Sequence, residues 1–398
     1  MSSFVDVNNL QRRYESTLRR IKFLSSLRKI LGLSEYENID SKQWDGIQLP
    51  LAAVENRLMS NLKIRGASFL PFLHVPAAAR KLNVLLGRIE MELTDIMVFF
   101  DSYMDILSQR RIHSLGSQLK GCDRLAEDAL SINHRIFTEL ERPIVSCERG
   151  FGALIIRAGV TFPGGIKNPV PLIQIPYSRF ITKYDMTSVI HEVGHDALAR
   201  LGMNRTLPRV FKAALMNSGA PQEIIKLYSL WSSEIGPDFW GFCCAGMAQT
   251  LSIKELLSLP PSRVFHFSSD DPHPAIYIRV LLSIEWCKQM WGTGRWDLWK
   301  REWDTLYPIE LASENKNLLK VCRDFIPVVA NALLNTRFSV LDGKKLLSLF
   351  DMKVLLPENL ERVILRFKTG SLDLKGLRPC AQLAAFRLLR EKGSLGED

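Results

Sequence analysis

The segment His191-Glu192-Val193-Gly194-His195 constrains the fold of this 398-residue chain more than any other segment does. Residues four positions apart lie on one face of a helix, so a helix here would bring both imidazoles to one metal ion. Glu192 lies beside them, where it can take a proton from metal-bound water. The alternative is a helix whose two histidines only pack or hydrogen-bond. With 7 His in the chain, chance predicts roughly 0.007 such motifs, which favours the metal interpretation.

The residues around the motif favour a helix with defined ends. Thr182-Lys183-Tyr184-Asp185 matches a capping box, which predicts a helix start. Gly202 predicts the helix end. The apolar residues between these limits recur at helical spacing: Met186, Val189, Ile190, Val193, Ala197, Leu198 and Leu201.

A catalytic metal site needs a third protein ligand and an open position for water. Residues 196–201 lack the Gly and third His of the metzincin pattern. Glu234 lies further along the chain, with room for a loop and a returning helix before it. It is the favoured third ligand, and Glu223, Asp238 and His266 are the alternatives.

Asp238 and Pro237, which follow Glu234, affect the structure expected around it. Asp238 follows four positions later. Pro237 lies between them, and proline is tolerated in the first turn of a helix. A helix is therefore expected to begin near Ser233.

This arrangement resembles the gluzincin metallopeptidases, in which a downstream Glu completes a zinc site and an Asp four residues later orients a ligating His. The resemblance implies that His191, His195 and Glu234 bind Zn2+. It also implies that Glu192 is the general base and that Asp238 orients a ligating His through its far ring nitrogen.

The segment Asp271-Pro272-His273-Pro274, with Arg279 soon after it, is loosely similar to a segment of the HtpX-type and CAAX-processing gluzincins. The resemblance implies a catalytic role for His273 or Arg279 in stabilising the oxyanion of the reaction. One of them is expected within about 8 Å of the metal. The alternative is a proline-rich turn before a helix, with Arg279 in a salt bridge.

Composition narrows the class of protein. The net charge of +10 could indicate nucleic acid, but no nucleic-acid motif is present, so a solvated basic surface is favoured. No apolar run is long enough to span a membrane, and the start of the chain lacks a secretory signal. Seven scattered cysteines are typical of reduced thiols. A cytoplasmic protein is expected.

Hydrophobic periodicity predicts a mainly α protein with a small β-sheet (α+β). We expect a helical N-terminal domain over 1–144, a zincin-like metallopeptidase domain over 145–305 and a helical C-terminal region over 306–398. Short strands are predicted near 150–156 and 169–176. Pro169, Pro171 and Pro176 predict that the second is an edge strand able to hold an extended peptide.

The sequence thus predicts a zinc-dependent metallopeptidase with a peptide or protein substrate, and the absence of an exopeptidase signature favours an endopeptidase. Glu192 would activate a zinc-bound water. One alternative is a catalytically silent zincin-like interaction or regulatory protein, although an intact Glu192 argues against it. Another is a proteolytic switch in a stress or gene-regulation pathway. The oligomeric state stays open.

Overall fold

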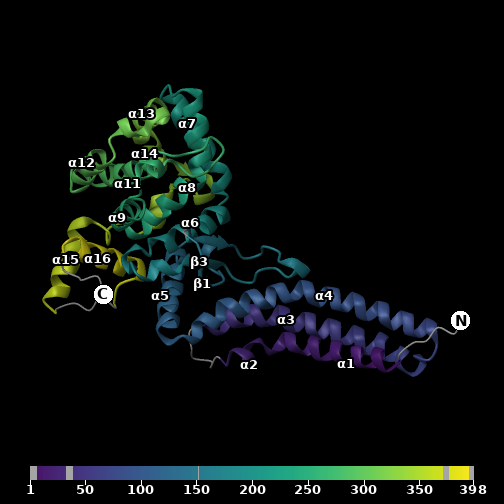
Figure 1. The fold of residues 1–398 in the computed structure, drawn as a ribbon. Coiled ribbons are helices and arrows are strands. Elements are labelled where there is room, and N and C mark those ends of the chain that lie inside the picture. The colour runs from purple at the N-terminus through teal and green to yellow at the C-terminus, as the bar shows by residue number, and fades with distance from the viewer. Residues whose placement is uncertain (1–6, 33–38, 151, 371–375, 394–398) are drawn as a thin grey trace. The chain divides into compact units, whose positions relative to one another are not determined.

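The computed structural model describes residues 7–32, 39–150, 152–370 and 376–393 (Figure 1). The chain divides into two compact units. Unit 1 comprises residues 1–123, 141–148 and 156–174, and unit 2 comprises 124–140, 149–155 and 175–398. These limits differ from the expected boundaries after residues 144 and 305. The extreme ends of the expected terminal domains lie outside the described residues.

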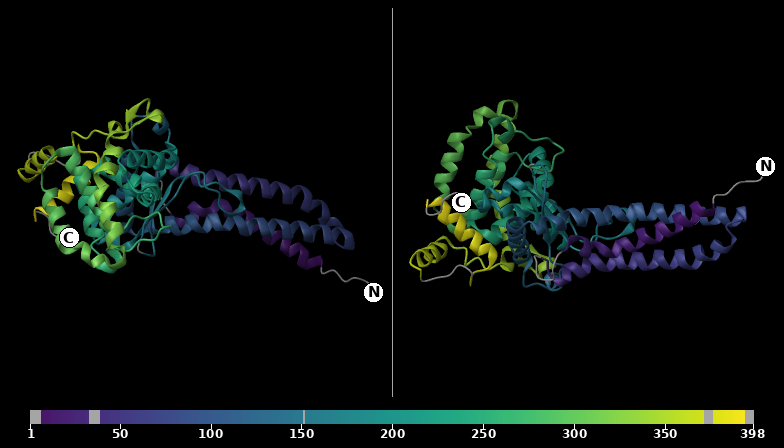
Figure 2. Two further views of the ribbon diagram at one scale, coloured as in Figure 1. Left: turned by 90° about the horizontal axis from the view of Figure 1, so that it is seen from above. Right: turned by 60° about the horizontal axis from the view of Figure 1, so that its bottom comes forward.

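Unit 1 is built around three long helices that run side by side (Figures 1 and 2). Its helices are α1 (Val7–Phe23), α2 (Leu27–Leu31), α3 (Ser41–Asn61) and α4 (Pro76–Ser108). Proline at the first position of α4 suits a helix start, because its missing N–H has no partner there anyway. Leu82, Leu86, Ile89 and Leu93 then recur every three or four residues and are buried. This stripe packs against α1 and α3 to form the core of the unit.

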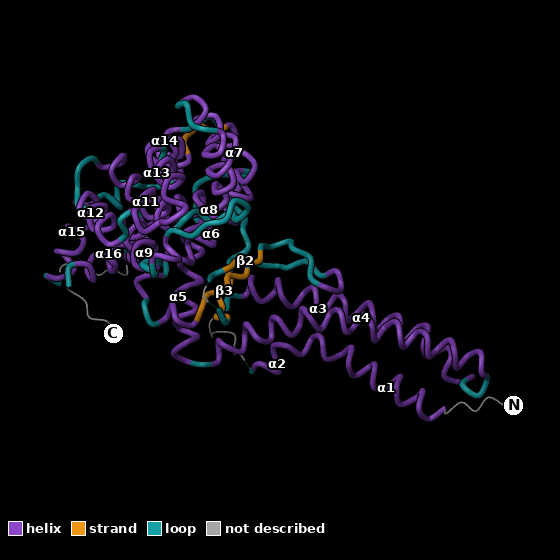
Figure 3. Tube along the Cα trace, turned by 45° about the horizontal axis from the view of Figure 1, so that its top comes forward, coloured by secondary structure: helices purple, strands orange, loops and turns teal. Residues whose placement is uncertain are grey.

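Strands are few, as the orange segments of Figure 3 show. Three of them, β1 (Ile144–Glu148), β2 (Leu154–Ile156) and β3 (Leu172–Pro176), form a sheet in the order β1-β3-β2. The expectation of an edge strand at 169–176 is therefore wrong, because β3 is the middle strand. Pro169 and Pro171 precede the strand and Pro176 ends it, so the interior residues keep their backbone donors.

Unit 2 is helical, and its central elements are α6 (Thr187–Arg200) and α8 (Gln222–Ala245). The helix α5 (His113–Leu130) belongs partly to each unit by sequence. The other helices of unit 2 are α7 (Met203–Asn217), α9 (Met247–Leu256), α10 (Pro261–Val264), α11 (Ile276–Trp291), α12 (Trp296–Leu306), α13 (Lys316–Asp324), α14 (Ile326–Asn335), α15 (Pro357–Lys368) and α16 (Pro379–Glu391).

The last helix, α16, is joined to the rest of unit 2 by ion pairs. Arg387 donates to Asp185 at 3.1 Å, and both side chains are almost fully buried. Arg387 and Arg390 also bind Glu255 of α9. Ahead of α16, Arg378 binds Asp128 at 2.7 Å. These contacts explain why the residues after 306 share a unit with the His-Glu-x-x-His helix.

A short hairpin was missed in the part of the chain expected to be wholly helical. β4 (Arg337–Phe338) and β5 (Lys344–Lys345) pair antiparallel, with Arg337 opposite Lys345. Asp342 and Gly343 both have positive φ in the connection. Asp-Gly is a strong hairpin signal, so the sequence did carry this feature. Among the described helices, none combines the length and apolar character needed to cross a membrane.

Candidate metal centre

The helix that carries the two histidines is α6. It ends at Arg200, and Gly202 follows in the left-handed conformation with φ of 66°, as the sequence predicted. Its start differs from the prediction. Residues 183–185 form a separate 3-10 turn, no side chain caps α6, and Asp185 binds Arg387 instead of a backbone N–H.

Glu234 and Asp238 lie within α8, which begins well before them at Gln222. The expectation that a helix starts near Ser233 is wrong, and Pro237 lies inside the helix. An interior proline costs ~3 kcal/mol because it removes a hydrogen bond. The surrounding residues Trp231, Phe239 and Trp240 are fully buried. Full burial of each stabilises the fold by about 1.5–3 kcal/mol, which outweighs the cost of the proline.

Helices α6 and α8 meet at two glycines. A Cβ atom at Gly194 would lie 2.8 Å from Pro237 Cα and 3.0 Å from Trp240 Cβ. A Cβ atom at Gly236 would lie 2.8 Å from a methyl carbon of Leu198. Glycine is therefore the residue that lets these two backbones approach closely. Gly194 is the fourth residue of the motif, so the motif encodes the helix packing as well as the two imidazoles.

This close packing brings three side chains together. The His191 and His195 Nε2 atoms lie 3.2 Å apart. Glu234 places Oε2 at 3.3 Å from His191 Nε2 and Oε1 at 3.6 Å from His195 Nε2. One donor atom from each residue lies within 4.8 Å of the others, so this largely buried group could hold a metal ion. Within the described residues, neither Glu223 nor His266 belongs to a group of this kind.

Asp238 contacts His191 on the opposite side of its ring. The Asp238 Oδ1 atom lies 2.8 Å from His191 Nδ1, within hydrogen-bonding distance. In the neutral form of His191, a proton on Nδ1 donated to this carboxylate leaves the Nε2 lone pair directed toward Glu234 and His195. This is the contact that the resemblance to the gluzincins implied for Asp238.

Arg279 of α11 lies behind the same carboxylate. Its Nη2 atom donates to Asp238 Oδ1 at 2.8 Å, and its Nε atom donates to Asp238 Oδ2. The guanidinium also lies 3.4 Å from His191 Nδ1. Arg279 is thus close to the donor group, but on the side of His191 that faces away from Glu234. It forms the salt bridge of the alternative interpretation, and its partner is Asp238.

The charges in this group favour a cation at its centre. Burial lowers the pKa of His191, but the charge and hydrogen bond of Asp238 outweigh burial and raise it to about 9. Burial and the neighbouring His191 lower the pKa of His195 to about 4. Burial raises the pKa of Glu234, but the hydrogen bond and charge of His191 outweigh burial and lower this pKa to about 2. Burial also raises the pKa of Asp238, but the charges of Arg279 and His191 outweigh burial and lower it. The carboxylates of Glu234 and Asp238 therefore both stay ionised beside the imidazoles.

Glu192 lies next to this group on α6 and is buried, with 7% of its surface exposed. Burial raises the pKa of its carboxyl, and the neighbouring Glu234 adds to this effect. Among the described residues, none forms a hydrogen bond with the Glu192 carboxylate. Its carboxylate is therefore available to accept a proton.

His273 comes before α11 and approaches from the solvent side. Its Nε2 atom lies 3.8 Å from Glu234 Oε2, and its side chain is 60% exposed. Asp271 Oδ1 accepts a hydrogen bond from the His273 backbone N–H at 2.9 Å and lies 2.6 Å from Nδ1. The orienting role of Asp271 was not predicted, although Asp two residues before His is a turn signal. The structure thus brings both His273 and Arg279 to the group, in different places.

Comparison with known proteins finds no similarity at a significant level: no family model, no curated protein and no solved structure matches the chain. The resemblance to the gluzincins therefore rests on the motif and its surroundings. What the structure adds is a buried His-His-Glu group with a carboxylate behind one of its imidazoles.

Proposed function

We propose that this chain is a zinc-dependent metallopeptidase of the gluzincin type. The observation that carries the proposal is the convergence of His191, His195 and Glu234. Glu192 lies beside them on α6, and among the described residues none forms a hydrogen bond with its carboxylate. A helix that only packed its two histidines would not need a buried carboxylate facing both of them. Nor would it need a second carboxylate behind one.

Zinc is the ion that this donor set suits best. Two imidazoles and one carboxylate form one of the three-ligand sets of catalytic zinc sites, which keep a fourth position open. Calcium and magnesium prefer oxygen ligands alone. When bound, zinc would polarise a substrate carbonyl and lower the pKa of a bound water to about 7. The hydrogen bond from His191 to Asp238 fixes the ring orientation that binding requires.

Glu192 supplies the general base in this proposal. Its carboxylate takes the proton from the attacking water and passes it to the leaving amine of the peptide bond. Its raised pKa, caused by burial, brings it closer to neutral pH, where a general base is most effective. Burial also excludes bulk water from around the carboxylate, which strengthens its interaction with the attacking water.

His273 and Arg279 take different roles. When both ring nitrogens of His273 carry protons, Nδ1 can donate to Asp271 and the exposed Nε2 atom can donate a hydrogen bond to the oxygen of a substrate carbonyl. Arg279 is occupied by Asp238, so it acts as a positioning residue that holds the carboxylate behind His191. The oxyanion role suggested by the sequence is therefore proposed for His273 alone.

The test combines metal analysis with cleavage of an unstructured protein such as casein. The purified chain should contain close to one zinc ion and should lose cleavage when a chelator removes it. Glu192→Gln should retain zinc, because it preserves shape, but lose hydrolysis, because an amide accepts no proton. Glu223→Gln, in the first turn of α8, is the matched control and should cleave normally.

Cleavage that survives in Glu192→Gln would overturn the mechanism. A chain that binds no transition metal after zinc addition and dialysis would overturn the site itself. Stoichiometric zinc without cleavage of any unstructured substrate would instead support the catalytically silent interaction protein.

A further inference from the structure

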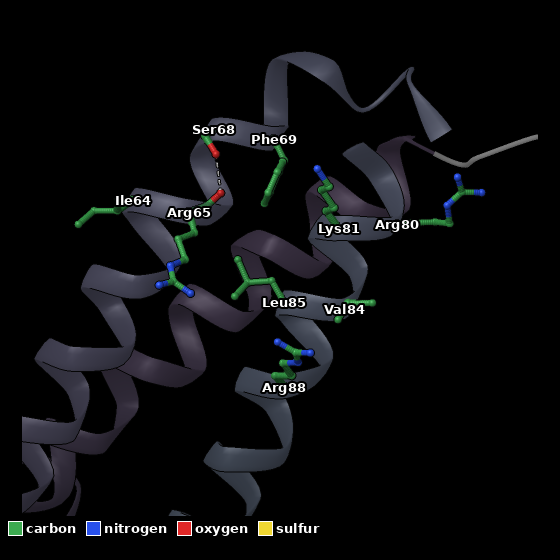
Figure 4. Close-up of a pocket in the computed structure, with 9 residues that line it drawn as sticks. All are labelled: Ile64, Arg65, Ser68, Phe69, Arg80, Lys81, Val84, Leu85 and Arg88. Carbon is green, nitrogen blue, oxygen red and sulfur yellow. Dashed lines mark hydrogen bonds between the residues drawn. The ribbon is translucent and has the colours of Figure 1, made fainter. Parts of the chain in front are cut away.

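A second site lies in unit 1, at the end of the long helices where α3 leads into α4 (Figure 4). A pocket of about 520 Å3 opens there between the turns that follow α3 and the first turns of α4. Nine residues line it: Ile64, Arg65, Ser68, Phe69, Arg80, Lys81, Val84, Leu85 and Arg88. Four of these are basic and none is acidic. The volume lies within the range typical of ligand-binding pockets.

The charge of this region is unusually one-sided. Between Glu55 and Glu90 the sequence contains six basic residues and no acidic residue. Arg57 alone among the six forms an ion pair in the described part of the chain, with Glu92. The four basic residues that line the pocket have no acidic partner among the described residues. A cluster of unpaired like charges repels itself, so it is stabilised when an anion binds.

The apolar residues of the pocket distinguish it from a simple anion site. Figure 4 shows Phe69 and Leu85 pointing into the space between the two segments, with Lys81, Arg65 and Arg88 around them, whereas Arg80 points away. Ile64 is 72% exposed and Val84 51%.

Further along the connection to α4, two more large apolar side chains reach solvent, Phe72 and Val75. Exposed aliphatic and aromatic side chains next to basic ones are typical of surfaces that enter the headgroup region of a bilayer.

We propose that this pocket binds the headgroup of an anionic phospholipid and thereby attaches the chain to a membrane surface. Arg65, Lys81 and Arg88 would bind the phosphate, while Ile64 and Val84 would contact the first carbons of the acyl chains. The arrangement fits a lipid better than a nucleic acid, because a phosphodiester backbone offers no partner for exposed aliphatic side chains. This attachment requires no membrane span and does not depend on the proposed peptidase activity.

Co-sedimentation of the full chain with vesicles tests the proposal. The chain should bind vesicles of equal parts phosphatidylglycerol and phosphatidylcholine, and should not bind pure phosphatidylcholine. Each basic side chain close to an anionic surface strengthens binding by about fivefold. Arg65→Gln/Lys81→Gln/Arg88→Gln should therefore bind on the order of 100-fold more weakly. Glutamine favours helices about as well as these residues do, and all three side chains are exposed, so the fold should persist.

The matched control removes three equally exposed basic residues from α7 in unit 2, as Arg205→Gln/Arg209→Gln/Lys212→Gln. It changes net charge by the same amount and should bind vesicles as the unchanged chain does. If both triple variants lose vesicle binding equally, the pocket is not the binding site and only a nonspecific effect of net charge remains.

The apolar part is tested separately. Ile64→Ser should weaken vesicle binding on the order of tenfold, since one large aliphatic side chain leaves the interface. Leu298→Ser, which changes a similarly exposed residue of α12, should have no effect. Binding to heparin without binding to anionic vesicles would overturn the proposal in favour of a polyanion.

Discussion

The glycine inside the His-Glu-x-x-His motif offers the sharpest test of how the candidate site is built. Gly194→Ala adds one carbon at the point where α6 touches α8, 2.8 Å from Pro237 Cα. Ordinary contact requires at least 3.4 Å, so the two backbones must separate by about 0.6 Å. Overpacking costs about 1–3 kcal/mol, and the upper value applies because the obstacle is backbone. Alanine favours a helix by ~1 kcal/mol over glycine, which leaves a net loss of about 2 kcal/mol.

Two measurements follow from this displacement. For a unit of this size, a loss of ~2 kcal/mol lowers the Tm by about 4–8 °C. Circular dichroism during heating of the metal-free protein measures it. The same displacement moves His191 and His195 away from Glu234, and metal sites tolerate errors of about 0.2 Å. Competition with a chromophoric chelator should therefore show weaker zinc binding by Gly194→Ala.

Two glycines provide controls. Gly87 on α4 has no atom within 4 Å of an added Cβ, so Gly87→Ala should be neutral or stabilising by up to ~1 kcal/mol. At Gly236 the obstacles are flexible ends of Leu198 and Leu207, so Gly236→Ala should cost less than Gly194→Ala. The reasoning is refuted if Gly194→Ala melts as high as the unchanged chain and binds zinc equally well.

Three further predictions concern the carboxylates of unit 2. Asp238→Ala should weaken zinc binding by ~10–100-fold without removing a ligand, as measured by competition with a chelator. An unchanged zinc affinity would contradict the role of Asp238 in orienting His191. Arg387→Leu leaves Asp185 buried without its partner and should destabilise unit 2 by about 3–5 kcal/mol in urea unfolding; a loss below ~1 kcal/mol would count against this pair. Burial raises the pKa of Glu255, but the hydrogen bonds and charges of Arg390 and Arg387 outweigh burial and lower this pKa below its usual 4.5. The ionised Glu255 carboxylate therefore stabilises the fold above pH 4.5. This stabilisation is lost as the pH falls through the pKa of Glu255 in the folded state. The stability difference between the unchanged chain and Glu255→Gln should therefore shrink on acidification below 4.5, and a difference that grows there would disprove it.

Local patterns predicted the parts of the site that depend on neighbours in sequence. The four-residue spacing of His191 and His195 and the helix end at Gly202 follow from helix geometry. Both depend only on residues of one helix. The contact of Asp238 with His191 joins two helices, and it was expected from the resemblance to the gluzincins.

The features that were mispredicted depend on contacts between distant residues. Thr182 to Asp185 matches a capping box, but Asp185 is bound by Arg387, some 200 positions away. Pro237 indicated a helix start, but the buried surroundings of α8 keep the helix continuous through it. The prolines near β3 indicated an edge strand because sequence alone did not show that they flank the strand. In the first two cases long-range packing outweighed a valid local signal, and in the third the start of the strand was mispredicted.

The candidate metal centre draws all its donors from two helices, and this has a consequence for how distant relatives should be recognised. On each helix the essential residues lie one turn apart, His191 with His195 on α6 and Glu234 with Asp238 on α8. Inserting or deleting one residue within either interval turns the second side chain by about 100°, so neither interval can change length gradually. The stretch between the intervals supplies no donor and can lengthen or shorten during evolution. Divergent members of this lineage should therefore share the two intervals and the glycine at 194, with a variable distance between them.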